Sequence, residues 1–176
     1  GGLLTMGLAA ARPGLVMAAM LNDIGPEVGG GGLDFVRGFI GGRHTQPDLE
    51  HAAAYLREIL PWLSLSTPEE WREFAALTFA RDPDGRWSAN WDPAIARTLD
   101  GRALPDLWPL FGALARVPLL LVRGGASDIL SAGTAGRMRQ RRPDMADLVL
   151  PGIGHAPTLS EPQIAPALDD WIEAQP

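Results

Sequence analysis

Short apolar runs alternate with helix-like segments in the first and last parts of this chain, and this alternation strongly limits the folds it can adopt. Apolar runs occupy residues 15–21, 117–122 and 148–150, and each ends in a turn. A short run that is apolar throughout indicates a strand buried on both faces of a sheet. Strands that alternate with helices form βα units, so the sequence predicts an α/β fold with a mostly parallel sheet and flanking helices.

Helices are expected next to each of these strands. Residues 132–142 form a helical segment that ends at Pro143, although two glycines weaken it. Apolar side chains near the C-terminus recur at the spacing of one helix face, namely Ile164, Leu168, Trp171 and Ile172. This stripe is typical of a helix that packs on a sheet.

The pattern changes between Gly29 and Arg116. The tract of glycines at residues 29–32 resembles a hinge, and the residues after it have helical periodicity. Helices are expected at residues 47–60, from Thr67, from Pro93 and at residues 105–115. We therefore expect core segments at residues 1–28 and 117–176 and an inserted helical region at residues 29–116.

Two turns after neighbouring strands carry residues suited to catalysis. Ser127 and Asp128 follow the run at residues 117–122, and His155 follows the run at residues 148–150 between Gly154 and Ala156. Open α/β sheets bind ligands at the carboxyl ends of their strands, so both turns should meet at one edge. A carboxylate there can orient the imidazole, which can then act as a general base.

The order of these residues resembles the late part of the α/β-hydrolase fold superfamily, in which the nucleophile precedes the acid and the acid precedes the histidine. The opening Gly1-Gly2 and the helical residues after it resemble the helix that follows the nucleophile elbow G-x-S-x-G, with Gly1 as its last glycine. The resemblance implies a serine two positions before Gly1. The chain therefore resembles the C-terminal part of such a protein, and we expect the N-terminal remainder to be its partner in catalysis.

The resemblance also implies roles for individual residues. Asp128 is the preferred acid, and His155 is the expected general base. Asp23 is the alternative acid or a substrate contact, because some family members carry the orienting carboxylate one strand earlier. The inserted region resembles the cap of these enzymes, and Trp87 and Trp91 are candidates to line a substrate pocket. The alternative for each ring is packing within the cap itself.

The reaction class depends on the nucleophile. A serine implies acyl transfer from an ester, lactone or related small apolar carbonyl compound; an aspartate implies dehalogenation or epoxide hydrolysis. Epoxide hydrolases usually use two cap tyrosines, and this chain has only Tyr55. A non-catalytic binding protein of the same fold is the remaining alternative.

The amino-acid composition limits the binding partners and the chemistry that can be expected of this chain. The net charge of −6 disfavours nucleic-acid binding, which needs a basic face. All basic residues are arginine and cysteine is absent, which excludes lysine and cysteine nucleophiles within the chain. No spacing indicates a metal site, and no cofactor is expected. No apolar run approaches the roughly 20 residues of a membrane span, so we expect no segment of these residues to insert in a bilayer. The expected location is the cytoplasm, and the expected partner is a small-molecule substrate. The oligomeric state is left open.

Overall fold

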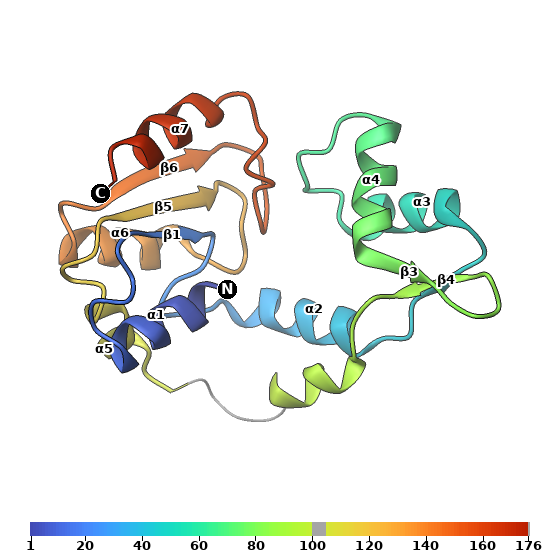
Figure 1. The fold of residues 1–176 in the computed structure, drawn as a ribbon, viewed down its shortest axis with the longest axis horizontal. Helices are drawn as coiled ribbons and strands as arrows, with labels where there is room; N and C mark the ends of the chain where they lie inside the picture. The colour runs from blue at the N-terminus through green and yellow to red at the C-terminus, as the bar shows by residue number, and fades with distance from the viewer. Residues whose placement is uncertain (100–104, 176) are drawn as a thin grey trace. The chain divides into compact units, whose positions relative to one another are not determined.

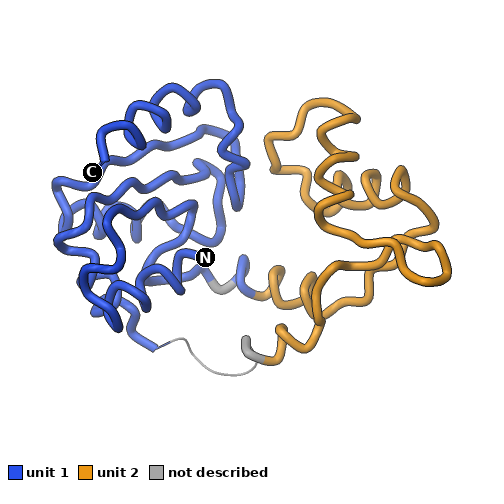
Figure 2. The backbone as a smooth tube through the Cα atoms, in the orientation of Figure 1, with its two compact units in different colours: residues 1–33, 103–176 blue, residues 34–102 orange. Residues whose placement is uncertain are grey.

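The computed structural model describes residues 1–99 and 105–175 and forms two compact units (Figure 2). Unit 1 comprises Gly1–Leu33 and Ala103–Pro176, and unit 2 comprises Asp34–Arg102. Each unit contains its own sheet and its own cluster of buried apolar side chains.

A parallel three-stranded sheet forms the centre of unit 1, in the order β1-β5-β6 (Figure 1). Its strands are β1 (Ala19–Asn22), β5 (Leu119–Gly124) and β6 (Ala146–Leu150). Every residue of β5 is buried, because this central strand is covered on both faces, and this explains its unbroken apolar run. The expected parallel α/β sheet is confirmed.

Helices cover both faces of this sheet. They are α1 (Gly2–Ala11), α5 (Trp108–Gly112), α6 (Ala132–Arg141) and α7 (Ala165–Glu173). Leu119 and Leu121 of β5 pack in one apolar cluster with side chains of α1, α5 and α6. Leu120 and Val122 pack in a second cluster with Leu168 of α7. The alternation along β5 therefore places three helices on one face of the sheet and α7 on the other.

Buried Arg142 fastens the end of α6 to the segment between α5 and β5. Its guanidinium donates to the carbonyls of Leu114 and Val117 and forms a 2.7 Å ion pair with Asp144. Hydrogen bonds from Arg142 lower the pKa of Asp144 to about 2. The arginine-rich end of α6 thus includes one structural side chain, in addition to exposed charges.

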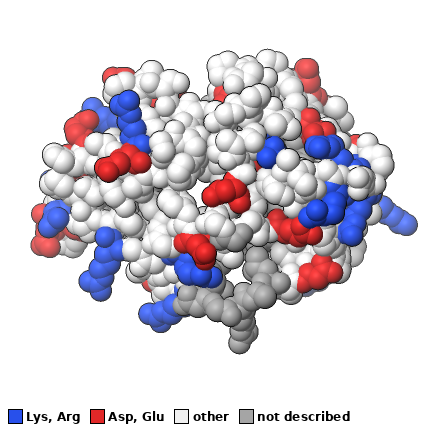
Figure 3. Space-filling view, turned by 180° about the vertical axis from the view of Figure 1, so that it is seen from behind, with Lys and Arg blue, Asp and Glu red and all other residues white. Residues whose placement is uncertain are grey.

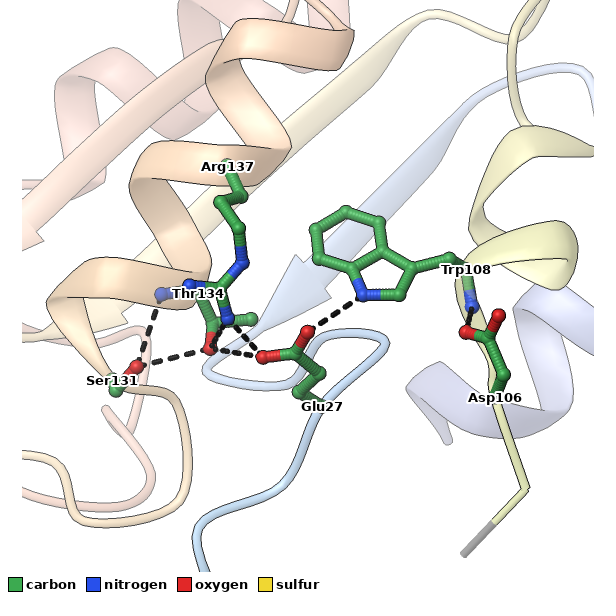
Figure 4. A network of polar contacts seen from close by, with 6 residues as sticks. All are labelled: Glu27, Asp106, Trp108, Ser131, Thr134 and Arg137. Atoms are coloured by element: carbon green, nitrogen blue, oxygen red, sulfur yellow. Dashed lines mark hydrogen bonds and ion pairs between the residues drawn. The ribbon is translucent and has the colours of Figure 1, made fainter.

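Glu27 connects three segments of unit 1 (Figure 4). One carboxylate oxygen accepts from the Trp108 indole at 2.7 Å, and the other accepts from the Thr134 hydroxyl at 3.1 Å and from Arg137. These hydrogen bonds lower the pKa of Glu27, and the bond from Trp108 has the largest effect. The network ties the segment after β1 to α5 and to the first turns of α6.

Unit 2 combines helices with a small antiparallel sheet. Its helices are α2 (Gly30–Gly41, which starts in unit 1), α3 (Leu49–Ile59), α4 (Pro68–Thr78) and the 3-10 helix η1 (Pro93–Leu99). The strands β2 (Thr45–Gln46), β3 (Phe79–Arg81) and β4 (Trp87–Ala89) pair in the order β2-β4-β3. Thr67 and Glu70 form a capping box at the start of α4, the helix expected from Thr67. The inserted region is thus not purely helical.

The unit boundaries differ from those expected at residues 29 and 116. The segment at residues 105–115 belongs to unit 1, because Phe111 and Leu114 are buried in the core that α1 also contributes to. The glycine tract also has a different role, since α2 begins within it. A Cβ on Gly29 would lie 2.0 Å from the backbone oxygen of Asp128, so close backbone approach requires glycine there.

Charges of both signs lie on the face shown in Figure 3, where several basic side chains gather at the right of the view with acidic side chains beside them. In the part of the chain that the structure describes, no helix has the length and apolar character needed to cross a membrane.

Candidate active site

The carboxyl ends of β1, β5 and β6 lie at one edge of the unit 1 sheet, where Asp23, Gly124 and His155 come together. The register pairs Asn22 with Val122 and Gly124 with Leu150, so the strands end close to one another. Asp23 directly follows β1, and its amide donates to the carbonyl of Val122 at 2.7 Å. The backbone pairing of β1 with β5 therefore continues up to Asp23 and fixes its position.

The Asp23 side chain is completely buried and bonded through both carboxylate oxygens. Oδ1 accepts from the backbone N–H of Gly124 at 3.0 Å, and Oδ2 lies 2.9 Å from Nδ1 of His155. A carboxylate removed from water needs such partners to remain stable as an anion. Asp23 is therefore built into the sheet edge as an acceptor for the histidine.

The contact with Asp23 determines which nitrogen of His155 carries the proton. An ionised carboxylate only accepts hydrogen bonds, so Nδ1 of His155 donates its proton to Asp23. In the neutral imidazole the lone pair is then on Nε2. The side chain of His155 is 30% exposed, and this tautomer is the one that a general base in a catalytic triad requires.

The loop that carries His155 lies directly against the end of β5. The amide of Ala126 donates to the carbonyl of Ile153 at 2.9 Å. A Cβ on Gly124 would lie 2.4 Å from the carbonyl oxygen of Gly154, closer than side-chain carbons approach backbone oxygens. Gly124 therefore has two functions: its N–H binds Asp23, and its missing side chain admits the histidine loop.

Backbone strain is concentrated beside this pair. Among the described residues other than glycine, Asp23 and Leu159 have positive φ angles, of 54° and 69°. Aspartate adopts this left-handed region more readily than most residues, whereas a bulky leucine there is an outlier. Such conformations cluster at functional sites. Asp23 contacts His155 directly and Leu159 follows it in the same loop, which supports a functional role for this edge.

Asp128, the acid that the sequence pattern favours, occupies a different position. Its side chain is exposed, and Oδ1 lies 3.0 Å from the point where a Cβ on Gly32 would stand, beside the first turn of α2. A carboxylate there stabilises a helix N-terminus. The hydroxyl of Ser127 accepts from the amides of Ile129 and Leu130, as in an ordinary turn. The geometry thus favours Asp23 over Asp128, the reverse of the expected ranking.

Trp87 and Trp91 lie within unit 2 and are half-buried there. Trp87 packs against the buried cluster of the unit. The Trp91 indole donates to the carbonyl of Ile40 at 2.9 Å, and its ring lies 5.2 Å from that of Phe39. These contacts are those of side chains that help to form the core of unit 2.

Unit 2 has a concave pocket of about 290 Å³ that neither tryptophan lines. Its walls come from α2, α3 and the segment between them: Asp34, Phe35, Gly38, Phe39, His44, Tyr55 and Ile59. His44 donates from Nε2 to the carbonyl of Phe39 at 2.6 Å and accepts the Tyr55 hydroxyl at Nδ1, also at 2.6 Å. Burial, with a further contribution from Glu58, raises the pKa of Tyr55, so the hydroxyl remains protonated. His44 is thus a half-buried wall residue of this pocket, hydrogen-bonded through both ring nitrogens.

Unit 1 also has a pocket, of about 470 Å³, which lies away from His155. It is lined by residues such as Val16 and Val117, which precede β1 and β5 at the amino ends of the strands. Among residues 1–99 and 105–175, no group of three or more His, Cys, Asp or Glu side chains could hold a metal ion.

Sequence and structure comparisons relate the chain to hydrolases. No family model matches it. It is 34% identical over 176 residues to a 3-hydroxybutyrate-oligomer hydrolase of Cupriavidus necator, covering 94% of this chain and 60% of that protein. An α/β hydrolase structure from Novosphingobium aromaticivorans is 42% identical with a TM-score of 0.88, covering 98% of this chain and 62% of the other.

A further solved structure is that of E-2-(acetamidomethylene)succinate hydrolase. It is 26% identical, with a TM-score of 0.78 over 97% of this chain and 62% of the other. The chain thus spans about 60% of the length of the relatives it matches.

Proposed function

Because this chain belongs to the α/β-hydrolase fold superfamily, we propose that the protein containing it hydrolyses an ester or related carbonyl compound through an acyl-enzyme. The observation that carries the proposal is the 2.9 Å contact between His155 Nδ1 and the buried carboxylate of Asp23. This arrangement orients an imidazole as a base at the carboxyl edge of a parallel sheet.

Asp23 is the orienting acid, and His155 is the general base. A serine ahead of Gly1 is the proposed nucleophile. Nε2 of His155 takes the hydroxyl proton as the serine oxygen attacks the carbonyl carbon, and the resulting imidazolium stays paired with Asp23. The imidazolium then gives this proton to the leaving alcohol as the ester bond breaks. Water, deprotonated by His155, then attacks the acyl-enzyme. The imidazolium returns this proton to the serine oxygen as the ester bond to the serine breaks and the acid is released.

The names of the relatives guide the choice of substrate. One relative is named a 3-hydroxybutyrate-oligomer hydrolase, and oligomers of a hydroxy acid are joined by ester bonds. We therefore propose short esters of small carboxylic acids, including hydroxybutyrate dimers and trimers, as the first substrates to assay. Ester cleavage suits a single histidine, because in each half-reaction the imidazole accepts one proton from the attacking oxygen and donates it to the leaving oxygen.

Unit 2 is proposed to act as the cap that selects the substrate. Its pocket combines the apolar walls of Phe35 and Phe39 with the hydroxyl of Tyr55, and binding sites for small molecules usually combine such surfaces. Trp87 and Trp91 support this pocket by packing in the unit's core and do not line it.

The central test uses the complete protein and an ester substrate. His155→Ala should lower kcat/KM by roughly three or more orders of magnitude, because the nucleophile, the base and the acid act together and the variant lacks the base. Asp23→Asn should lower kcat by about 10³- to 10⁴-fold, since the amide can hold the wrong tautomer. Asp128→Asn should change kcat less than about tenfold. A larger loss in Asp128→Asn than in Asp23→Asn would assign the acid to Asp128.

A serine-directed fluorophosphonate probe tests the nucleophile. One equivalent should label the complete protein, and labelling should be strongly slowed in His155→Ala because the hydroxyl loses its base. Trapping of an alkyl-enzyme ester on an aspartate would assign the protein to dehalogenases or epoxide hydrolases instead. Resistance to labelling together with absence of turnover would favour a non-catalytic binding protein.

A further inference from the structure

Asn22 links the end of β1 to the loop that carries His155. Its side-chain amide donates to the backbone carbonyl of Pro157 at 2.8 Å, across 135 residues of sequence. Asn22 immediately precedes Asp23, and Pro157 is two residues beyond His155. Asn22 and Asp23, adjacent at the end of β1, therefore contact the same loop. Asp23 binds the imidazole of His155, and Asn22 binds the backbone of Pro157.

The Pro157 carbonyl fixes the orientation of the Asn22 amide. A carbonyl oxygen only accepts, so the NH₂ group and not Oδ1 of Asn22 faces it. Oδ1 is buried without a hydrogen-bond partner in the described part of the chain. A buried acceptor left unpaired destabilises the folded state. An apolar residue would avoid this cost on a strand, so stability alone does not account for asparagine here.

The contact complements an anchor on the other side of the histidine. Before His155, the carbonyl of Ile153 accepts from the amide of Ala126 after β5. After His155, the carbonyl of Pro157 accepts from Asn22 at the end of β1. The loop is thus held on both sides of the imidazole by groups from two different strands.

We propose that Asn22 is a positioning residue for the catalytic histidine: it holds the Pro157 side of the loop so that Nε2 of His155 stays aligned with the nucleophile. The inference rests on the proposed function. Loss of the anchor lets the imidazole move while Asp23 still binds Nδ1. Misplacement of a catalytic group by about 1 Å costs up to roughly 100-fold in rate, so a loosened loop should mainly affect kcat.

The test compares Asn22→Ala with Asn22→Gln in the complete protein, with an ester substrate. Asn22→Ala should lower kcat by about 10- to 100-fold and change KM less than about twofold, because Asn22 acts through His155. Asn22→Gln keeps an amide donor and should recover part of the lost kcat. Ser131→Ala is the matched control: it removes the N-cap of α6, which should lower Tm without touching the histidine loop.

A spectroscopic measurement separates positioning from stability. In the wild type, the His155 Nδ1 proton that Asp23 binds should give a low-field NMR signal, which Asn22→Ala should broaden or abolish through faster exchange. Ser131→Ala should retain both this signal and kcat despite a lower Tm.

The proposal is overturned if Asn22→Ala keeps wild-type kcat and an unchanged signal, if KM rises while kcat is constant, or if Ser131→Ala loses kcat equally. Failure of the proposed function is distinct, since wild type and His155→Ala would then be equally inactive. The NMR signal still reports on the positioning of His155 in that case.

Discussion

Replacing Gly124 by alanine should damage catalysis more than its small change in size implies. The new Cβ would lie 2.4 Å from the carbonyl oxygen of Gly154 and 2.7 Å from that of Ile153, both backbone atoms that cannot rotate away. Restoring an ordinary contact requires the histidine loop to retreat by about 1 Å. Such a shift predicts a loss of kcat/KM of up to about 100-fold, or about 2.7 kcal/mol, with destabilisation of about 1–3 kcal/mol from overpacking.

Steady-state kinetics and thermal unfolding of the complete protein measure both effects. Gly136→Ala is the control, because a Cβ there meets no heavy atom within 4 Å and alanine favours the interior of α6 by up to about 1 kcal/mol. It should retain kcat/KM and raise Tm. If Gly124→Ala keeps kcat/KM within about twofold of wild type and an unchanged Tm, the argument from close approach of the loop is refuted.

Three other variants test separate features. Asp144→Asn should lower Tm at pH 7 but little at pH 2: a carboxylate whose pKa falls to about 2 on folding stabilises the protein above pH 4, and this is lost on acidification to pH 2. Tm measured across that range checks this, and an equal drop at both ends contradicts it. Phe35→Ala should change the ratio of kcat/KM between short and bulky esters by about 1–3 kcal/mol, whereas Trp91→Ala should mainly lower Tm. The opposite pattern would make Trp91 the selective residue.

The sheet of unit 1 could be predicted because its signals are local. Each strand contains a short apolar run, and the run from Leu119 to Val122 is continuous because β5 is buried on both faces. The capping box of Thr67 and Glu70 was predictable for the same reason, since both partners lie within one helical turn.

The sheet of unit 2 could not be predicted from local pattern. β2 has two residues, and β3 and β4 have three each, too few to show the alternation of a strand. They are held by pairings between distant residues, such as Thr45 with Ser88. The placement of α5 in unit 1 likewise depends on long-range burial of Phe111, which helical periodicity does not reveal.

The choice between the two acids depends on how loops cross the sheet edge. Asp23 follows β1 and His155 follows β6, and β5 lies between these two strands. Neighbouring strands are about 4.8 Å apart, so the two side chains must together span a separation of roughly 10 Å between β1 and β6. Asp128 follows β5, the direct neighbour of β6, and from the sequence it was therefore the preferred acid. Its turn, however, runs toward α2, while Gly124 leaves the end of β5 without a side chain. The Asp23 carboxylate reaches across this gap to the Gly124 amide, and the Gly154 carbonyl closes over the same glycine from the other side. The position of a single glycine at the end of the central strand therefore explains why the more distant aspartate contacts the histidine.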